Sequence, residues 1–424
     1  MRWCSSVLAV LAVVGGRGPA LPAAHAGTIA VSTAGELIAA IDAAQPGDVI
    51  VLADGTYALT GASCDVAGTA AQPIVVRAAT PLGARIELDS LEGFRVTAAH
   101  WHFEGLDIRG TCAVDASCEH AFHVSGAADG FVLRHSRVMD FNAQLKVNAS
   151  KIGDVHVAPD RGLVEYNELG DSRPRDTSNP VTKLNIDTGD DWVVRGNYLH
   201  DARKLQGDGV SYAAFLKSGG KRGLVERNLV VCATAGAPGA TGGTRIGLSF
   251  GGGGTGNEFC APAFDPAVPC SVEHDGGTIR NNIIASCSDV GIYLNRAPGS
   301  TILHNTLIGT AGIDFRFATT SGEATGNVLT GMVRTRDGAT MTATANQQGV
   351  TLAMFEAMYR APLAGDLVVT GDVSGLLGGA PGRADVPDDY CGVTRPAGRI
   401  ALGAIEHALP GCETLRPPQG TVGG

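Results

Sequence analysis

The chain has 424 residues, a formal net charge of −10 and a pI near 5.5. This acidity argues against the basic surface that nucleic-acid-binding proteins present, so we expect no nucleic-acid partner, although an anionic ligand could bind a few cations gathered in a groove. A chain of this length ordinarily indicates two or three domains, but an internal repeat overrides that expectation.

The first 26 residues have the pattern of a secretory signal peptide. Arg2 supplies a positive charge, residues 7–14 form a short apolar stretch, and residues 24–26 (AHA) match a cleavage site. The apolar stretch ends at Gly15, well short of the roughly 20 residues that a membrane span needs. We therefore predict a signal peptide over residues 1–26, no membrane insertion, and a secreted or periplasmic protein.

A helix and a strand are predicted next. Within residues 32–44 apolar side chains recur at helical spacing, at Leu37, Ile38, Ile41 and Ala44. Residues 46–48 (PGD) then turn the chain into the strand 49–52 (VIVL). A solenoid needs a cover for its first coil, so we predict that this helix caps the fold.

The middle of the chain repeats a unit of apolar strand, polar turn and apolar strand with one asparagine at a fixed place. The period is about 22 to 31 residues, and one longer interval contains an insertion at about 233–276. Ser136 and Asp107 are aligned with the asparagines in two earlier units. The asparagines are Asn167, Asn197, Asn228, Asn282, Asn305 and Asn327.

Such short units cannot bury an apolar face alone and must stack on their neighbours. Val- and Ile-rich strands with polar turns predict an all-β fold, a right-handed parallel β-helix with an N-terminal capping helix. A leucine-rich solenoid is disfavoured because no L-x-x-L-x-L frame recurs. We assign the asparagines a structural role, as a stacked ladder that tolerates left-handed backbone and bonds the next coil.

We predict one β-helix domain over residues 27–412, a disordered tail over 413–424, and a monomer. Cys4 lies in the predicted signal peptide, which leaves an odd number of cysteines in an exported chain. Short loops favour three disulfides, namely Cys112–Cys118, Cys260–Cys270 and Cys391–Cys412.

Segments at both ends resemble secreted β-helix proteins of the chondroitinase B and alginate lyase family. Residues 41–57 (IDAAQPGDVIVLADGTY) are similar to the opening segment of such proteins. Residues 389–396 (DYCGVTRP) and 402–406 (LGAIE) are similar to their closing segment. At the level of fold the resemblance covers almost the whole mature chain, and it implies action on an acidic polysaccharide.

In that family a lysine base and an arginine acid lie on neighbouring coils, and calcium held by carboxylates neutralises the uronate. Residues 215–220 (FLKSGG) are similar to the family's Asn-Lys-Ser stretch, which places Lys217 at the base position. Ser249 stands where the family has its acid. Val210 and Tyr212 stand where the family has calcium-binding carboxylates, and the nearest acid is Asp208.

The chemistry of uronate β-elimination also selects candidates. It needs a base near C5, a cation for the carboxylate and a proton donor for the leaving oxygen. We assign these roles to Lys217, to Arg245, and to His123 or His156. Counting back from the ladder places His156 and Lys217 in one column of the repeat, with Ile186 between them.

Further residues are predicted to bind substrate or metal. Phe215 and Tyr212 can stack on a sugar ring, and Ser249 lies nearby in the repeat. Asp187, Asp190 and Asp208 belong to an acidic cluster around one coil that could bind calcium, the one cofactor we consider.

The sequence thus favours a carbohydrate-active enzyme that cleaves an extracellular acidic polysaccharide by β-elimination. An epimerase of such a polysaccharide would use the same kind of site and stays open, as do two further alternatives. A glycoside hydrolase on this scaffold would need two carboxylates across the groove, either Asp208 with Glu226 or Glu273 with Asp275. A non-catalytic carbohydrate-binding or surface protein would show no convergent polar cluster around Lys217.

Overall fold

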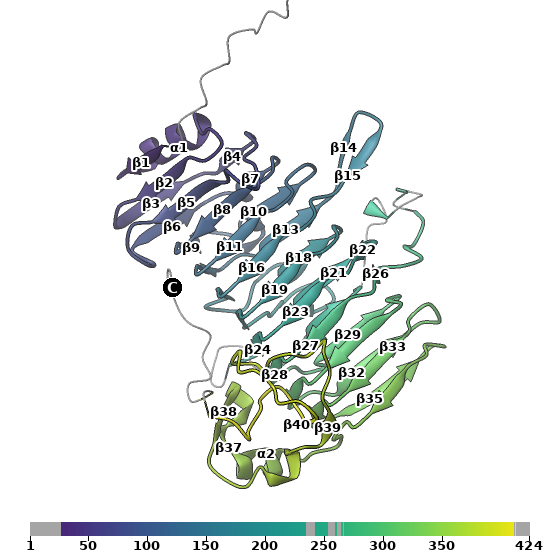
Figure 1. The fold of residues 1–424 in the computed structure, drawn as a ribbon. Coiled ribbons are helices and arrows are strands. Elements are labelled where there is room, and N and C mark those ends of the chain that lie inside the picture. The colour runs from purple at the N-terminus through teal and green to yellow at the C-terminus, as the bar shows by residue number, and fades with distance from the viewer. Residues whose placement is uncertain are drawn as a thin grey trace, which may run out of the picture.

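The computed structural model describes residues 27–234, 242–252, 259–260, 264–265, 267–410 and 412. The predicted signal peptide and the predicted C-terminal tail lie outside the described residues. The fold is a right-handed parallel β-helix, as predicted, in which three long parallel sheets run the length of the solenoid (Figure 1). Neither described α-helix has the length and apolar character that crossing a membrane requires.

Each coil contributes one strand to each sheet, and neighbouring strands belong to successive coils. Sheet 1 contains β1 (Thr28–Val31), β2 (Val49–Leu52), β5 (Ile74–Ala78), β8 (Trp101–Glu104), β11 (Val132–Arg134), β16 (Leu163–Glu165), β19 (Val193–Arg195), β23 (Leu224–Glu226), β27 (Thr278–Arg280), β30 (Ser300–Leu303), β33 (Gly322–Thr325) and β36 (Thr342–Thr344). Sheet 2 contains β4 (Ala62–Cys64), β7 (Glu92–Val96), β10 (His120–Ser125), β13 (Ala143–Asn148), β18 (Val181–Asp187), β21 (Val210–Lys217), β25 (Thr244–Phe250), β29 (Ile292–Asn295), β32 (Gly312–Arg316) and β35 (Met332–Arg336). Sheet 3 contains β3 (Gly55–Leu59), β6 (Ala84–Leu88), β9 (Asp107–Gly110), β12 (Arg137–Met139), β17 (Glu168–Gly170), β20 (Tyr198–His200), β24 (Leu229–Val231), β28 (Ile283–Ala285), β31 (Thr306–Ile308) and β34 (Val328–Leu329).

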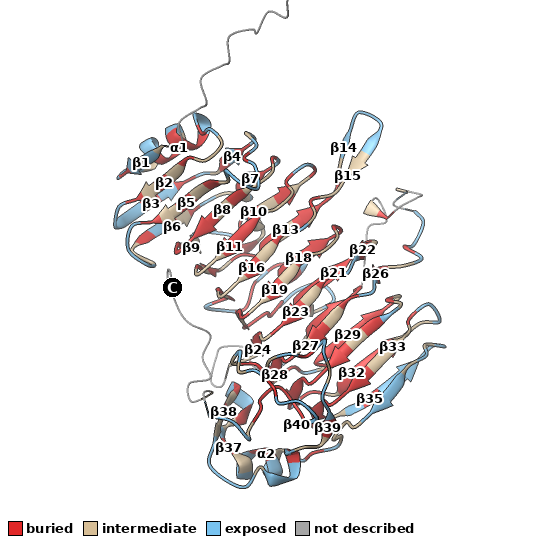
Figure 2. Cartoon of the chain, in the orientation of Figure 1, coloured by how far each residue is buried: buried red, intermediate tan, exposed pale blue. Residues whose placement is uncertain are grey.

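The core runs along the axis of the solenoid, and many strands of the three sheets, such as β2 and β5, alternate buried and more exposed residues (Figure 2). Near the N-terminal end Phe94, Phe103, Phe122 and Phe131 fill it, and the ring centroids of the first three lie 4.8 to 5.2 Å apart. Successive coils place similar apolar residues at the same level, so each coil completes the burial that its neighbours begin.

The asparagine ladder is present and continues beyond the predicted members to Asn346. In each step the Asn side-chain oxygen accepts from the backbone N and the Nδ2 of the preceding Asn, as Asn197 does for Asn167, both at 3.0 Å. One detail of the prediction is wrong, because the residue before the asparagine adopts the left-handed backbone, for example Tyr166 with φ 56°. Another correction concerns Asp107, since it pairs with Arg137 and thus lies one residue past the ladder position.

The predicted capping helix is α1 (Ala34–Asp42). Thr33 and Glu36 form a reciprocal capping box at its start, which satisfies backbone donors that the first turn leaves free. Leu37 and Ile41 are buried against the first coil. The apolar periodicity of this segment therefore predicted correctly which face of the helix packs on the solenoid.

Two predicted boundaries differ from the structure. The segment predicted as an insertion contains β25, a regular strand of sheet 2, so one coil passes through it. The coils end at β36, and the rest of the predicted domain packs outside the solenoid against sheet 3. This C-terminal segment contains α2 (Leu352–Met358), β37 (Tyr359–Ala361), β38 (Asp366–Val369), β39 (Ala380–Pro381) and β40 (Arg399–Ile400).

The three predicted disulfides are present, together with an unpredicted one between Cys232 and Cys287. The latter closes a long stretch of chain that sequence spacing alone does not single out. Cys64 is buried and not disulfide-bonded.

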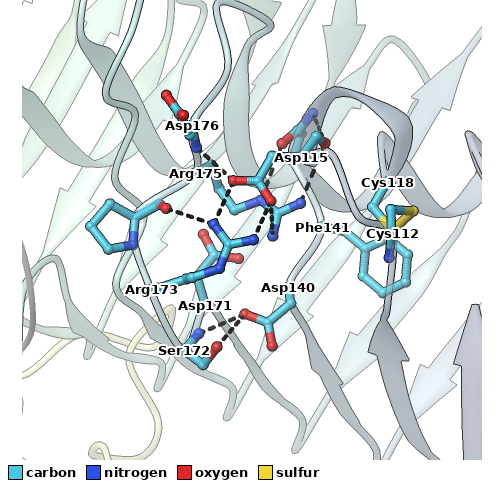
Figure 3. A network of polar contacts seen from close by, with 12 residues as sticks. Cys112, Asp115, Cys118, Asp140, Phe141, Asp171, Ser172, Arg173, Arg175 and Asp176 are labelled. Carbon is cyan, nitrogen blue, oxygen red and sulfur yellow. Dashed lines mark hydrogen bonds and ion pairs between the residues drawn. A yellow bond between two sulfur atoms is a disulfide. The ribbon is translucent and has the colours of Figure 1, made fainter. Parts of the chain in front are cut away.

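A network of charges fixes the loop between β17 and β18 (Figure 3). Asp115, which follows the disulfide-bonded Cys112, accepts bonds of 2.6 and 2.7 Å from Arg173 and one of 2.6 Å from the backbone N of Asp176. The buried Arg175 lies 3.2 Å from the same carboxylate. The loop leads directly into β18, so this network positions a strand of sheet 2.

Candidate functional site

A groove of about 640 Å³ lies on the outer face of sheet 2, above β13, β18, β21, β25 and β29. The strand register decides which side chains meet there. Lys146 is level with Asn185, and Asn185 with Phe215. Two residues further along the strands, Asn148 is level with Asp187, and Asp187 with Lys217.

The floor of the groove contains two lysines that share one carboxylate. Lys146 Nζ donates to Asp187 Oδ2 at 2.7 Å and to Asn185 Oδ1 at 3.0 Å. Lys217 Nζ lies 3.7 Å from the same oxygen and 4.5 Å from the ring centroid of Phe215. The hydroxyl of Ser218 donates to the other oxygen of Asp187.

Burial and charge oppose each other at this triad. Burial lowers the pKa of Lys146, and the nearby charge of Lys217 lowers it further, while Asp187 partly offsets both. Burial alone would raise the pKa of Asp187, but the two lysines outweigh it and hold that pKa below its usual range. Lys146 therefore loses its proton more easily than an ordinary lysine does, which suits a general base.

Sequence reasoning missed Lys146. A signal for it exists, because polar Gln144, Lys146 and Asn148 alternate with Leu145 and Val147 in a single strand, the pattern of an outward-facing polar row. The strand nevertheless carries no resemblance to a known motif, and its distance in sequence from Lys217 concealed the pairing.

The groove is locally cationic in an acidic protein. Its described lining includes five cations and three carboxylates, although the whole chain has a net charge of −10. The cations are Lys146, Lys204, Lys217, Arg316 and Arg336, and the carboxylates are Asp187, Asp208 and Asp289. An anionic polymer would meet a favourable local field here.

Of the predicted site residues, Lys217, Phe215, Tyr212, Asp187 and Asp208 line this groove. Tyr212 and Phe215 belong to an apolar cluster with Ile246, Val290 and Tyr293. Both rings are largely covered, with exposed fractions of 8% and 4%. They therefore form a wall of the groove rather than a projecting platform.

Arg245 and Ser249 lie in different surroundings from the predicted site residues that line the groove. Arg245 lines a second cavity of about 210 Å³ with Arg203 and with Lys204, which also lines the groove. The single hydroxyl hydrogen of Ser249 has the backbone oxygens of Gly251 and Tyr293 as its acceptors, so the side chain is held by the scaffold.

The predicted column that joins His156 to Lys217 is wrong. His156 lies on β15 (Val155–Val157), which forms an antiparallel hairpin with β14 (Ser150–Ile152) outside the three sheets. Its ring stacks on Phe264 with centroids 3.7 Å apart. The hairpin adds residues to this coil, so counting back from the ladder does not find the residue level with Lys217.

His123 lies on β10, next to the groove. Its Nδ1 is 2.7 Å from Glu92 Oε1, and its Nε2 is 3.0 Å from Oδ1 of Asn148, which lines the groove. The structure thus places His123 on the strand next to that of Lys146 and level with it.

The three carboxylates predicted to bind calcium do not converge. Asp187 is engaged by two lysines, Asp190 pairs with Arg222 at 3.1 Å, and Asp208 pairs with Lys204 at 2.5 Å. Calcium requires six to eight oxygen ligands, whereas these oxygens face cations. The residues therefore do not fit a calcium ion, and we assign no step to one.

Comparisons with known proteins agree with the architecture. The family model described as chondroitinase B matches residues 31–106, the first coils of the solenoid. A solved rhamnogalacturonan lyase is similar with a TM-score of 0.54 and 15% identity, covering 78% of this chain and 89% of its own. The pectate lyase Pel9A is similar with a TM-score of 0.50 and 14% identity, covering 91% and 97%. No curated protein matches the sequence, and at these identities the similarity establishes the fold alone.

Proposed function

We propose that this protein is a lyase that cleaves an extracellular acidic polysaccharide by β-elimination in the groove of sheet 2. The observation that carries the proposal is the Lys146–Asp187–Lys217 triad, which places a base with a lowered pKa beside a second cation. The cationic lining favours a uronate-containing chain. Four disulfides suit an exported protein, and the two similar structures named above are polysaccharide lyases.

The two lysines divide the chemistry between them. Neutral Lys146 removes the proton from C5 of the uronate, and charged Lys217 neutralises the adjacent carboxylate so that negative charge can develop there. Tyr293 lines the groove, and its hydroxyl accepts a bond from Arg316 at 3.3 Å. We assign Tyr293 to protonate the leaving oxygen, which completes the elimination. Sequence analysis assigned the role of base to Lys217, but the lowered pKa of Lys146 favours Lys146 for that role.

Neither pair of acids predicted for the hydrolase alternative lies together in the groove. Glu226 lies on sheet 1 and is bound by Arg195 and Arg280, each at 2.6 Å. Glu273 accepts from the backbone N of Ser218, and Asp275 lies on β26 (His274–Asp275), paired with β22 (Gly220–Lys221). None of these three carboxylates is among the described residues that line the groove.

The proposal is tested by incubating the purified protein with pectate, rhamnogalacturonan, alginate and glycosaminoglycans, each with and without a chelator. We expect ultraviolet absorbance from an unsaturated uronate product with at least one polymer, and a slower rise of this absorbance in Lys217→Ala. New reducing ends without this absorbance would instead identify a hydrolase. Binding without cleavage of any polymer would support the non-catalytic alternative.

The triad also predicts a characteristic pH dependence. Because the base must be neutral, kcat/KM should rise as pH increases through the lowered pKa of Lys146. Asp187→Asn removes the carboxylate that raises this pKa and leaves the burial that lowers it, so the rising limb should move to lower pH. The measurement is the pH profile of each enzyme relative to its own maximum, with Asp154→Asn on the exposed hairpin as control. If the rising limb of the pH profile lies at the same pH in Asp187→Asn as in the wild-type enzyme, the assignment of Lys146 as the base is contradicted.

A further inference from the structure

A cluster of two histidines and one glutamate lies on the outer face of sheet 2, on the N-terminal side of the groove. Glu92 on β7 is level with His120 on β10, and His123 follows on the same strand. One ligand atom from each of the three residues lies within 4.8 Å of the other two. His123 Nδ1 is 2.7 Å from Glu92 Oε1, and His120 Nδ1 is 3.8 Å from the same oxygen. Among the described residues, no other such cluster of three is found.

Both rings direct Nδ1 toward Glu92 and the opposite nitrogen toward an oxygen. His123 Nε2 is 3.0 Å from Asn148 Oδ1, and His120 Nε2 is 3.9 Å from a carboxylate oxygen of Glu119. A metal-bound histidine typically donates its other N–H to such an acceptor, which fixes the tautomer and the ring orientation. The arrangement therefore presents two ring nitrogens and one carboxylate oxygen to a common point.

An independent observation concerns His120. Its Nδ1 is buried and has no hydrogen-bond partner, a costly state for a polar atom of the interior. This nitrogen faces the carboxylate of Glu92 at 3.8 Å, and the other oxygen of Glu92 lies 3.3 Å from Arg95. A cation bound between His120, His123 and Glu92 would satisfy this nitrogen with Oε1 of Glu92 as its third ligand.

We propose that Glu92, His120 and His123 bind a divalent transition-metal ion of the zinc class, with a coordination position left for water or a substrate oxygen. Two imidazoles and one carboxylate suit zinc and its neighbours, whereas calcium and magnesium prefer oxygen ligands throughout. A tetrahedral ion about 2.0 to 2.1 Å from each ligand separates the ligands by about 3.4 Å, so Glu92 and His123 would move apart by less than about 1 Å.

The site adjoins the groove through Asn148. This side chain lines the groove and also accepts from His123, so it links a metal ligand to the surface where a polymer would lie. The metal site does not depend on the proposed lyase activity, because none of its three ligands has a role in the elimination. Its test is therefore a binding measurement rather than an activity assay.

The experiment uses protein prepared without a polyhistidine tag, freed of metal with a chelator and titrated with cobalt(II) and zinc(II). We expect one equivalent of cobalt(II) to bind and to give the visible absorption bands of a tetrahedral cobalt site. Zinc(II) should displace the cobalt and abolish these bands. His123→Gln should weaken binding by at least about 100-fold, and Asn148→Ala by about 10-fold through the loss of an outer contact. His102→Asn, on sheet 1, is the matched control and should bind as wild type does.

A readout on the wild-type protein guards against misfolded variants. X-ray absorption of the zinc-loaded protein should show two imidazole ligands. The proposal is overturned if the wild-type protein binds no cobalt or zinc, if the absorption spectrum shows no imidazole, or if His123→Gln binds as tightly as wild type.

Discussion

Replacing Lys146 with alanine should lower kcat/KM by about 10²- to 10⁴-fold, the range that a positioned general base contributes. The substitution removes the amine whose pKa is lowered by burial and by the charge of Lys217, and leaves the rest of the groove in place. The measurement is the initial rate of formation of unsaturated product on the polymer that the wild-type enzyme cleaves. Lys151→Ala, at an exposed lysine of the nearby hairpin, is the control and should keep full activity.

Comparison with Lys217→Ala separates the two roles. Loss of the cation that neutralises the uronate should affect both KM and kcat, whereas loss of the base should mainly lower kcat. A small primary amine added to the solution should partly restore the activity of Lys146→Ala, because it can replace the missing base. If the amine rescues Lys217→Ala and leaves Lys146→Ala inactive, the roles are reversed and Lys217 is the base.

Asp115→Asn should cost about 3 to 5 kcal/mol of unfolding free energy, the usual cost of breaking a buried ion pair from one side. Asp115 and Arg175 have side chains only 2% and 3% exposed, so the substitution leaves a buried guanidinium without its carboxylate. Arg173 contributes less, because its side chain is 52% exposed and solvent screens it. The check is the urea midpoint of the oxidised protein at neutral pH, with Asp154→Asn as an exposed control.

The effect has a defined pH dependence. Burial alone would raise the pKa of Asp115, but the arginines and the backbone N of Asp176 outweigh it and lower that pKa. A carboxylate of this kind contributes stability above its unfolded pKa of about 3.9 and loses it as pH falls through the lower folded value. The difference between the wild-type protein and Asp115→Asn should therefore be full at neutral pH and shrink only in strong acid. A midpoint for Asp115→Asn equal to that of the control at pH 7 would contradict this account.

The sequence by itself determined the architecture. Each coil must bury one apolar row and provide a hydrogen-bond acceptor for the buried backbone N–H of one turn. The period and the asparagines therefore recur visibly along the chain. Local signals were equally sufficient for the capping helix at Thr33 and for disulfides that close short loops, such as Cys112–Cys118. Such features depend on residues close together in sequence.

The site depended on the tertiary structure. Lys146 lies on β13 and Lys217 lies on β21. The two meet only because both strands pair with β18, the strand that carries Asp187. The turns between coils differ in length, as the hairpin that contains His156 shows, so counting along the sequence does not give that register. The pairing of backbone hydrogen bonds between coils sets which side chains are level. That pairing decided that two lysines share one carboxylate in the groove, while Arg245 lines a second cavity.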